Sequence, residues 1–313
     1  MATSKPNPPN TTCTTISSPF NGLPMLRWWG IFDIYLWEGF WYIQAFLEGA
    51  KSSFTALDND IIIAFSPKTG STWVKALVVS IMLRHDNGGG GGGGGGDGED
   101  EDADDPLRYN HPNDLVPSLE FQVCNKKNAN SDMPNTASNT TTRLFRTHIA
   151  YSQLPESIKS SRCKIVYITR DPKDVFVSMW HFINTKRSSE QDPFPFDEAF
   201  ESFCNGVYNF GPFHEHVLEY WNESLKSPQK VLFLKYEELK RDPRGEVKKL
   251  ASFLGRPLAD DGEAEKIVRR CSMERLKNLE VNRDGVDPWS SFPKSSYFRL
   301  GIVGDWKNKL QQR

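Results

Sequence analysis

Cysteine is scarce in this chain of 313 residues, and no Cys-x-x-Cys pair occurs in it. The five cysteines are Cys13, Cys124, Cys163, Cys204 and Cys271. An odd number of widely spaced cysteines is not the pattern of a disulfide framework or a zinc site, and it is typical of a reducing compartment. Cys204, His214 and His216 have metal-binding side chains, but their spacing matches no usual ligand set, so we expect no metal.

Long apolar runs are also lacking. The first 18 residues are rich in Thr, Ser, Asn and Pro and contain no apolar core of a secretory signal. The most apolar early stretch, Leu26–Leu47, carries Arg27, Asp33 and Glu38, which makes it a poor membrane span. We therefore expect a cytoplasmic protein without a membrane segment.

Neither sign of charge is in large excess, since the formal net charge is −2. Seven acids lie between Asp97 and Asp105, and without them the rest of the chain carries +5. A mildly basic body suits a small anionic ligand, but its charge is too low to predict nucleic-acid binding.

Two low-complexity segments divide the sequence. Residues 1–22 are polar and rich in Pro and Thr, and we expect a disordered tail there. Nine consecutive glycines followed by the acidic run predict a flexible, solvated Gly/Asp-rich insert at residues 87–105. The chain from residue 23 to residue 313 is long enough for one large domain that contains this insert.

Apolar runs alternate with helical patterns in the remaining sequence. Residues 60–65, 164–169 and 231–235 are short runs rich in apolar residues, typical of buried strands. Helical patterns follow them at Trp73–Leu83, at Lys173–Ile183 and from Tyr236 through Leu254. Alternating strands and helices predict a single α/β domain, in which helices flank both faces of a central parallel sheet.

Nine aromatic residues lie close together between Trp28 and Phe46. We interpret this stretch as helix-and-turn packing in the core. The alternative, which does not exclude the first, is a wall or gate of an apolar pocket.

The turn Ser66–Thr72 joins the first predicted strand to its helix. Its backbone N–H groups, the hydroxyls of Thr69, Ser71 and Thr72 and the helix N-terminus can together cradle an anion, and Lys68 adds a positive charge. The alternative is an ordinary capped turn, since Ser and Thr are common N-cap residues. This P-loop-like turn is not a Walker A loop, because Lys68 precedes the glycine, and that order counts against a Mg²⁺-dependent kinase.

Two more positions carry candidate chemistry. Arg170 follows the second predicted strand, and Ser178 lies two helical turns further on. An arginine can bind phosphate through two parallel hydrogen bonds, although a surface ion pair with Asp174 is an equally good interpretation. His148 ends the segment that begins at Thr142, where regular structure is expected to resume, and a lone histidine is more often a packed residue than a catalytic one.

These segments, taken in order, resemble the cytosolic sulfotransferases, and among them the plant-type branch. The resemblance runs from about Phe40 to the C-terminus and is interrupted by the glycine insert. The family motifs are matched by Pro67-Lys-Thr-Gly-Ser-Thr-Trp73, Tyr167-Ile-Thr-Arg-Asp-Pro-Lys-Asp-Val-Phe-Val-Ser178, Lys235-Tyr-Glu-Glu-Leu-Lys-Arg-Asp-Pro243 and Arg299-Leu-Gly-Ile-Val-Gly-Asp-Trp-Lys307. The plant branch is indicated by Arg275-Leu-Lys-Asn-Leu-Glu-Val-Asn282 and Gly39-Phe-Trp-Tyr42.

The resemblance implies a role for each matched position. Lys68 would contact the bridge between sulfate and phosphate of the donor 3′-phosphoadenosine 5′-phosphosulfate (PAPS), and His148 would be the catalytic base. The other donor-binding residues would be Thr69, Gly70, Ser71, Thr72, Trp73, Arg170, Ser178, Tyr236, Ser272, Arg299 and Gly301. Candidate lining residues of an apolar acceptor pocket are Trp41, Tyr42, Tyr151 and Phe182.

The implied reaction is the transfer of a sulfuryl group from PAPS to a hydroxyl of a small organic acceptor. The acceptor would be a phenol such as a flavonoid, a hydroxylated steroid or a jasmonate-like alcohol. An in-line displacement at sulfur is helped by a base at the hydroxyl, and cations and N–H donors stabilise the charge on the leaving oxygen. No metal is expected to take part.

Four positions depart from the family pattern. Met273 stands where a Phe usually sandwiches the adenine, and Leu300 replaces a basic residue. Ala150 stands where a Pro is usual, and the sequence stops at Arg313, in the region of the family's dimer contact, so no dimer is predicted. Two alternatives to the sulfotransferase remain: an inactive or weakened nucleotide-binding relative, and a P-loop nucleotide kinase.

Overall fold

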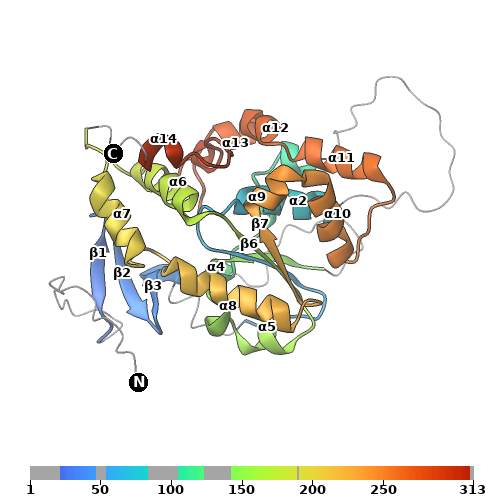
Figure 1. The fold of residues 1–313 in the computed structure, drawn as a ribbon, viewed down its shortest axis with the longest axis horizontal. Coiled ribbons are helices and arrows are strands. Elements are labelled where there is room, and N and C mark those ends of the chain that lie inside the picture. The colour runs from blue at the N-terminus through green and yellow to red at the C-terminus, as the bar shows by residue number, and fades with distance from the viewer. Residues whose placement is uncertain (1–21, 47–53, 84–104, 123–141, 189, 311–313) are drawn as a thin grey trace.

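The structure is a computed structural model, and it describes residues 22–46, 54–83, 105–122, 142–188 and 190–310. The predicted tail at residues 1–22 and the predicted insert at residues 87–105 lie outside the described residues, apart from Gly22 and Asp105. The described strands form two separate sheets, one parallel and one antiparallel (Figure 1).

The parallel sheet confirms the predicted centre of the α/β domain. Its strands are β4 (Ile61–Phe65), β5 (Leu144–Thr147), β6 (Lys164–Thr169) and β7 (Val231–Lys235), in the order β5-β4-β6-β7. Every residue of β4 is buried, because this strand lies inside the sheet and both of its faces are covered. All four strands run in the same direction, so their carboxyl ends meet at one edge of the sheet.

Helices cover both faces of this sheet, as predicted. On one face Ile61, Ile63 and Phe65 pack against a group of helices. That group contains α2 (Ser71–Met82), α9 (Tyr236–Arg241), α10 (Pro243–Phe253) and α11 (Asp261–Arg270). On the other face Ile62 and Ala64 pack towards α5 (Glu156–Ser160) and α8 (Phe213–Lys226), which lie together along the sheet in Figure 1.

The aromatic stretch near the N-terminus is a three-stranded antiparallel sheet, so the predicted helix-and-turn packing is wrong. Its strands are β1 (Met25–Trp28), β2 (Phe32–Trp37) and β3 (Phe40–Ile43). Glu38 and Gly39 both have positive φ angles, as a two-residue hairpin turn requires. The sheet packs through Trp28, Trp29 and Ile34 against α6 (Pro172–Asn184) and α7 (Phe196–Cys204).

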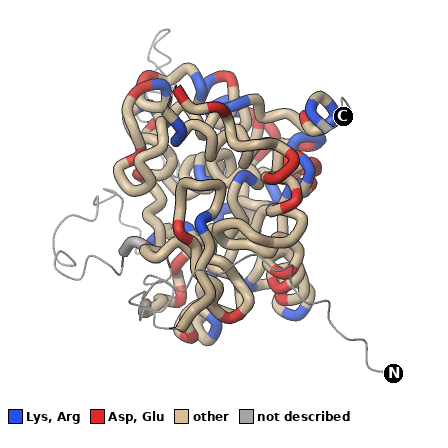
Figure 2. The backbone as a smooth tube through the Cα atoms, turned by 90° about the vertical axis from the view of Figure 1, so that its left-hand side faces the viewer, with Lys and Arg blue, Asp and Glu red and all other residues tan. Residues whose placement is uncertain are grey.

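Short elements complete the fold. They are η1 (Pro106–Arg108), α3 (Pro112–Leu115), α4 (Leu119–Gln122), η2 (Tyr151–Gln153), α12 (Met273–Asn278), α13 (Glu280–Arg283), η3 (Lys294–Tyr297) and α14 (Lys307–Leu310). In the described part of the chain, no helix has the length and apolar character needed to cross a membrane, and no group of His, Cys, Asp and Glu could hold a metal ion. Lys and Arg are interspersed with Asp and Glu over the side of the molecule that Figure 2 shows.

Candidate active site

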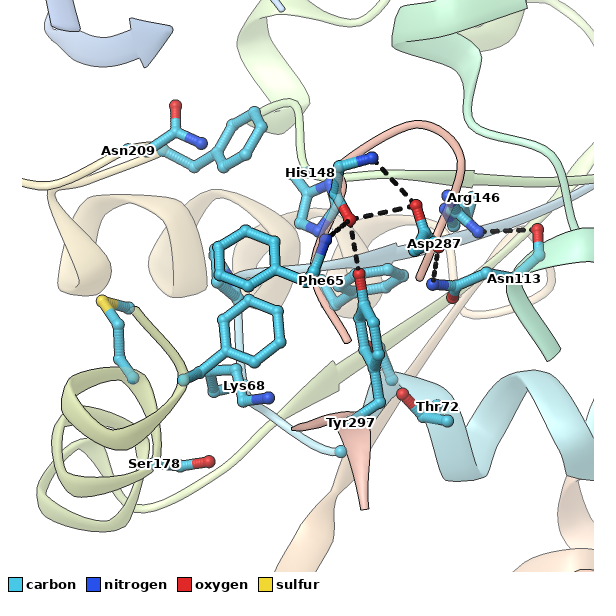
Figure 3. Close-up of a pocket in the computed structure, with 18 of the residues that line it drawn as sticks. Phe65, Lys68, Thr72, Asn113, Arg146, His148, Ser178, Asn209, Asp287 and Tyr297 are labelled. Carbon is cyan, nitrogen blue, oxygen red and sulfur yellow. Dashed lines mark hydrogen bonds between the residues drawn. The ribbon is translucent and has the colours of Figure 1, made fainter. Parts of the chain in front are cut away.

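A cavity of about 310 Å³ lies where the parallel strands end. Residues that follow β4, β5, β6 and β7 all reach its wall, namely Lys68, His148, Arg170 and Tyr236. Ligands of open parallel sheets bind at this edge. Figure 3 shows Lys68, His148 and Ser178 around the cavity. The structure therefore brings together the three segments in which the sequence predicted chemistry.

Most of the predicted donor-binding residues line this one cavity. They are Lys68, Gly70, Ser71, Thr72, Trp73, Arg170, Ser178, Tyr236, Arg299 and Gly301. Thr69 and Ser272 are not part of the wall. The Thr69 hydroxyl instead donates to the Ser66 carbonyl at 2.8 Å and closes the turn, and the Ser272 side chain accepts from Arg275 N–H and caps α12.

The turn between β4 and α2 has the geometry of an anion cradle. Lys68 and Gly70 have φ angles of 67° and 102°, and Gly70 is the N-cap of α2. The first N–H groups of a helix have no partner within the helix, and its dipole favours negative charge there. Gly70 also approaches Tyr236 so closely that a Cβ atom would lie 2.5 Å from the ring.

Two arginines line the same cavity, and one of them, Arg170, forms the expected ion pair with Asp174 at 3.3 Å, although the pair is buried and not on the surface. Arg170 donates to the Ile302 carbonyl at 2.7 Å, and its guanidinium lies 4.5 Å from the centroid of the Tyr236 ring. Arg299 donates to Asp305 at 2.6 Å. The Nε atoms of both arginines are buried and have no hydrogen-bond partner in the described structure, so each arginine has a donor to spare for an anion.

Lys68 is held in an apolar setting. Its ammonium lies 3.7 Å from the centroid of the Phe182 ring, and no ion pair of Lys68 occurs within the described ranges. Burial, followed by the positive charges of Arg299 and Arg170, lowers the pKa of Lys68 to about 7. An anionic ligand beside this amine would favour its charged form again.

His148 follows β5 and is fixed on several sides. Its ring stacks on Phe210 at 4.6 Å and meets Phe65 edge-on at 4.5 Å, both between centroids. Its Nδ1 lies 3.5 Å from the Glu120 carboxylate, and its backbone N–H donates to the same carboxylate at 2.5 Å. The Nε2 atom has no hydrogen-bond partner in the described part of the chain, and His148 lines the cavity. Its backbone carbonyl accepts from His216 at 2.9 Å when the Nε2 of His216 carries the proton.

The charges of Glu120 and His148 are coupled. Burial alone would raise the pKa of Glu120, but the hydrogen bonds and the charge of His148 lower it to about 2. For His148 the balance is reversed, because burial lowers its pKa more than Glu120 raises it. The imidazole is therefore neutral near pH 7, as a base must be before it takes up a proton.

The structure also brings to the cavity residues that the sequence analysis missed. Lys75, Asn113, Arg146 and Asp287 line its wall and are buried. Arg146 precedes His148 by two residues, and strand alternation could have indicated a shared face. No sequence signal identifies Asn113 or Asp287, because Asn113 lies in the one-turn helix α3 and Asp287 lies in a loop. Phe46, Phe65, Phe210 and Phe292 supply much of the apolar wall.

Of the four predicted acceptor-pocket residues, Phe182 lines the cavity and the others do not. Tyr42 is fully buried, where its hydroxyl donates to Gln153 and its ring meets Phe210 edge-on. Trp41 packs within the cluster below the antiparallel sheet. Tyr151 meets the Tyr220 ring edge-on, away from the cavity wall. Tyr42 therefore supports the wall from behind, through Phe210.

Three comparisons with known proteins agree with one another. The sulfotransferase domain family model matches residues 58–313. Cytosolic sulfotransferase 12 of Arabidopsis thaliana is 40% identical over 296 residues, covering 93% of this chain and 86% of that relative.

Solved structures give the same picture. An Arabidopsis thaliana sulphotransferase superposes with a TM-score of 0.65 at 38% identity, covering 83% of this chain and 84% of that chain. A mouse sulfotransferase complexed with PAP superposes with a TM-score of 0.62 at 26% identity, covering 88% of each chain.

Proposed function

Because this chain belongs to the sulfotransferase family, we propose that His148 is the base of a PAPS-dependent sulfuryl transfer to the hydroxyl of a small organic molecule. The observation that supports this proposal best is the common cavity of Lys68, Arg170 and His148. These side chains follow three different strands, so a shared cavity is what a reaction between a doubly phosphorylated donor and a hydroxyl needs. The names of its cytosolic relatives support a cytoplasmic location.

The donor fits the residues that are present. The turn at Gly70 and the N-terminus of α2 would bind the 5′-phosphate, and the spare Nε donors of Arg170 and Arg299 would bind the 3′-phosphate. Lys68 would donate to the oxygen between phosphorus and sulfur. PAPS supplies the sulfuryl group and an anionic leaving group. The PAP bound to the mouse relative supports this assignment.

In the proposed mechanism, His148 takes the proton of the acceptor hydroxyl on Nε2. The Glu120 carboxylate lies 3.5 Å from Nδ1, where its charge favours a proton on that nitrogen of the neutral ring and stabilises the imidazolium that forms. The acceptor oxygen forms a bond to sulfur as the bond from sulfur to the phosphate oxygen breaks. Lys68 and the N–H groups of the turn stabilise the charge on the leaving oxygen, so the step requires no metal.

The acceptor is proposed to bind against the aromatic part of the wall. Phe46, Phe65, Phe182 and Phe210 line the cavity, and His148 is packed between two of these rings. Flat or rigid apolar bodies fit such walls. The proposed acceptors are therefore phenols such as flavonoids, hydroxylated steroids and jasmonate-like alcohols.

A transfer assay with labelled PAPS and a panel of phenols and alcohols tests the proposal. His148→Ala should lower kcat by about 10²–10⁴-fold, the usual contribution of a general base. Its affinity for PAP, measured by calorimetry, should stay close to that of the unmodified protein. Arg170→Ala should have its main effect on donor binding and should raise the Kd of PAP. The control is His214→Ala, which changes an exposed histidine of α8.

Three outcomes would contradict this proposal. Near-normal turnover by His148→Ala would refute the assignment of the base. Tight binding of PAP without transfer to any acceptor would favour a nucleotide-binding relative without activity. Activity with ATP that excess EDTA removes would favour a nucleotide kinase.

A further inference from the structure

The cavity contains a second group of buried charges, separate from the cations assigned to the donor. Lys75 on α2, Asn113 on α3, Arg146 on β5 and Asp287 all line the wall. Their exposed fractions are 2%, 3%, 5% and 1%. Figure 3 shows Asn113, Arg146 and Asp287 close together beside His148. We call these four residues the inner polar cluster.

Asn113 connects the members of the inner polar cluster. Its side-chain oxygen accepts from the Lys75 ammonium, and its side-chain nitrogen donates to Asp287 at 2.7 Å. Its backbone carbonyl accepts from Arg146 Nη1 at 2.8 Å. The two cations and the carboxylate are thus held in place by hydrogen bonds and not by ion pairs.

The carboxylate of the cluster is already occupied. In addition to Asn113, it accepts from the backbone N–H groups of Trp289 and Ser290 at 3.1 and 2.9 Å, and from the Ser290 hydroxyl at 3.0 Å. Three of these donors bond to Oδ1 and Asn113 bonds to Oδ2, so most of the lone pairs of the carboxylate are in use. The charge of Asp287 raises the pKa of both Lys75 and Arg146, but it is one carboxylate beside two cations.

The two cations, by contrast, have donors to spare. Both hydrogen bonds of Arg146 come from Nη1, to the carbonyls of Asn113 and Val116, so Nε and Nη2 have no partner within the described ranges. In the same part of the chain, no carboxylate lies within 4.0 Å of either Arg146 or Lys75. Buried cations without an anionic partner are costly, and burial lowers the pKa of Lys75 well below its usual value.

From this geometry we propose that the inner polar cluster binds an oxyanion, a carboxylate above all, carried by the acceptor itself. This inference rests on the proposed function and narrows its substrate class to hydroxy acids. Arg146 lies on the edge strand β5, and His148 directly follows the end of that strand, two residues further on, which corresponds to about 7 Å of extended chain. A hydroxyl at His148 and a carboxylate at Arg146 therefore suit an acceptor whose two groups are about one aromatic ring apart.

A competing role for the same cations must be separated from this one. After burial and Glu120, the charges of Arg146 and Lys75 contribute to the pKa of His148, and both lower it. In that role they would favour the neutral base for every acceptor, whether or not it carries a charge. Only an oxyanion subsite predicts that the cations discriminate between a hydroxy acid and its ester.

An acid and its uncharged ester, used as acceptors, distinguish an oxyanion subsite from a general effect on the pKa of His148. The PAP-loaded protein is titrated by calorimetry with 4-hydroxyphenylacetate and with its methyl ester, and transfer to both is measured with labelled PAPS. The acid should bind at least about tenfold more tightly than the ester, and its kcat/KM should exceed that of the ester by a similar factor. The shorter 4-hydroxybenzoate and the longer 4-hydroxyphenylpropanoate test the spacing.

Variants then identify the groups responsible. Arg146→Gln and Lys75→Met should each lower the ratio of acid to ester, in binding and in kcat/KM, with folding checked by PAP affinity. Arg162→Gln, which changes an exposed cation paired with Asp58, should leave the ratio unchanged. If the unmodified protein binds the ester as tightly as the acid, or if the variants change both acceptors equally, the inference is wrong although the sulfotransferase remains. Failure to transfer to any acceptor would count against the proposed function, and the binding ratio would still decide the subsite.

Discussion

At His148, burial and a carboxylate act on one imidazole in opposite directions. Its position in the sequence matched a family motif, so the residue could be proposed before the structure was known. Glu120 could not be proposed in this way, because it precedes His148 by 28 residues in the sequence. The two residues lie close together because an isolated β-bridge pairs Ser118 with Arg146. A side chain that acts through another is found only when the fold brings the two together.

Removal of the Glu120 charge tests this pair. Glu120→Gln should lower kcat by about 10²-fold, at the lower end of general-base effects, while the KM of the acceptor changes little. Glu120 raises the pKa of His148, so its loss should move the acid limb of the kcat–pH profile to lower pH. Glu219→Gln is the control, since the Glu219 carboxylate accepts from the backbone N–H and the hydroxyl of exposed Ser152 and does not line the cavity. An unchanged profile would show that Glu120 has a structural role only.

Three of the four parallel strands were predicted as elements, whereas β5 and the N-terminal sheet were not. Residues 164–169 and 231–235 are strands with the predicted limits, because their uninterrupted apolar runs end at clear turn residues. The hairpins of residues 25–43 were not predicted, because their closely spaced aromatic residues hide the alternation of apolar and polar positions that is typical of a strand. The remaining signal was Gly39, whose positive φ belongs to a two-residue turn.

At the turn between β4 and α2, Gly70 lies so close to Tyr236 that there is no room for a side chain. Gly70→Ala would place Cβ 2.5 Å from Tyr236, whose ring covers Arg170, and would force alanine to a φ of 102°. We expect a loss of about 1–3 kcal/mol in the free energy of unfolding and a higher Kd for PAP. Urea unfolding and calorimetry measure the two effects.

The matched control for this change is Gly255→Ala, at a φ of 77° where Cβ would meet only the end of the Lys164 side chain, at 4.0 Å. This variant carries backbone strain without the contact at the site. It should therefore lose stability and keep its PAP affinity. Normal PAP binding by Gly70→Ala would show that the turn tolerates a side chain.

Across the whole molecule, the cavity is assembled from distant parts of the chain. The half that contains Lys68, Arg170 and Tyr236 follows from the rule that parallel strands end at one edge, which the sequence was sufficient to apply. The other half contains Asn113 and Asp287, 174 residues apart and joined by a hydrogen bond. A one-turn helix and a loop are too short to show a periodic pattern, so their convergence could not be predicted.

The folded protein holds several histidines in the neutral state, and this sets the pH dependence of its stability. Burial, followed by the charge of Lys75, lowers the pKa of His111 to about 3, and burial lowers that of His216 to about 4. In the unfolded chain both would take up a proton near pH 6.5. The unfolded state therefore binds more protons than the folded state below that pH, and acid favours unfolding.

The free energy of unfolding should thus be constant above about pH 7 and should decrease as the pH falls from about 6.5 to 4. Each histidine contributes a slope of about 1.4 kcal/mol per pH unit. Urea titrations at pH 7, 6 and 5 measure the total. His216→Gln should reduce the slope by one proton, whereas His214→Gln, on the exposed side of the same helix, should leave it unchanged. An equal slope in the His216 variant would mean that this imidazole is protonated in the folded protein, against the effect of its burial.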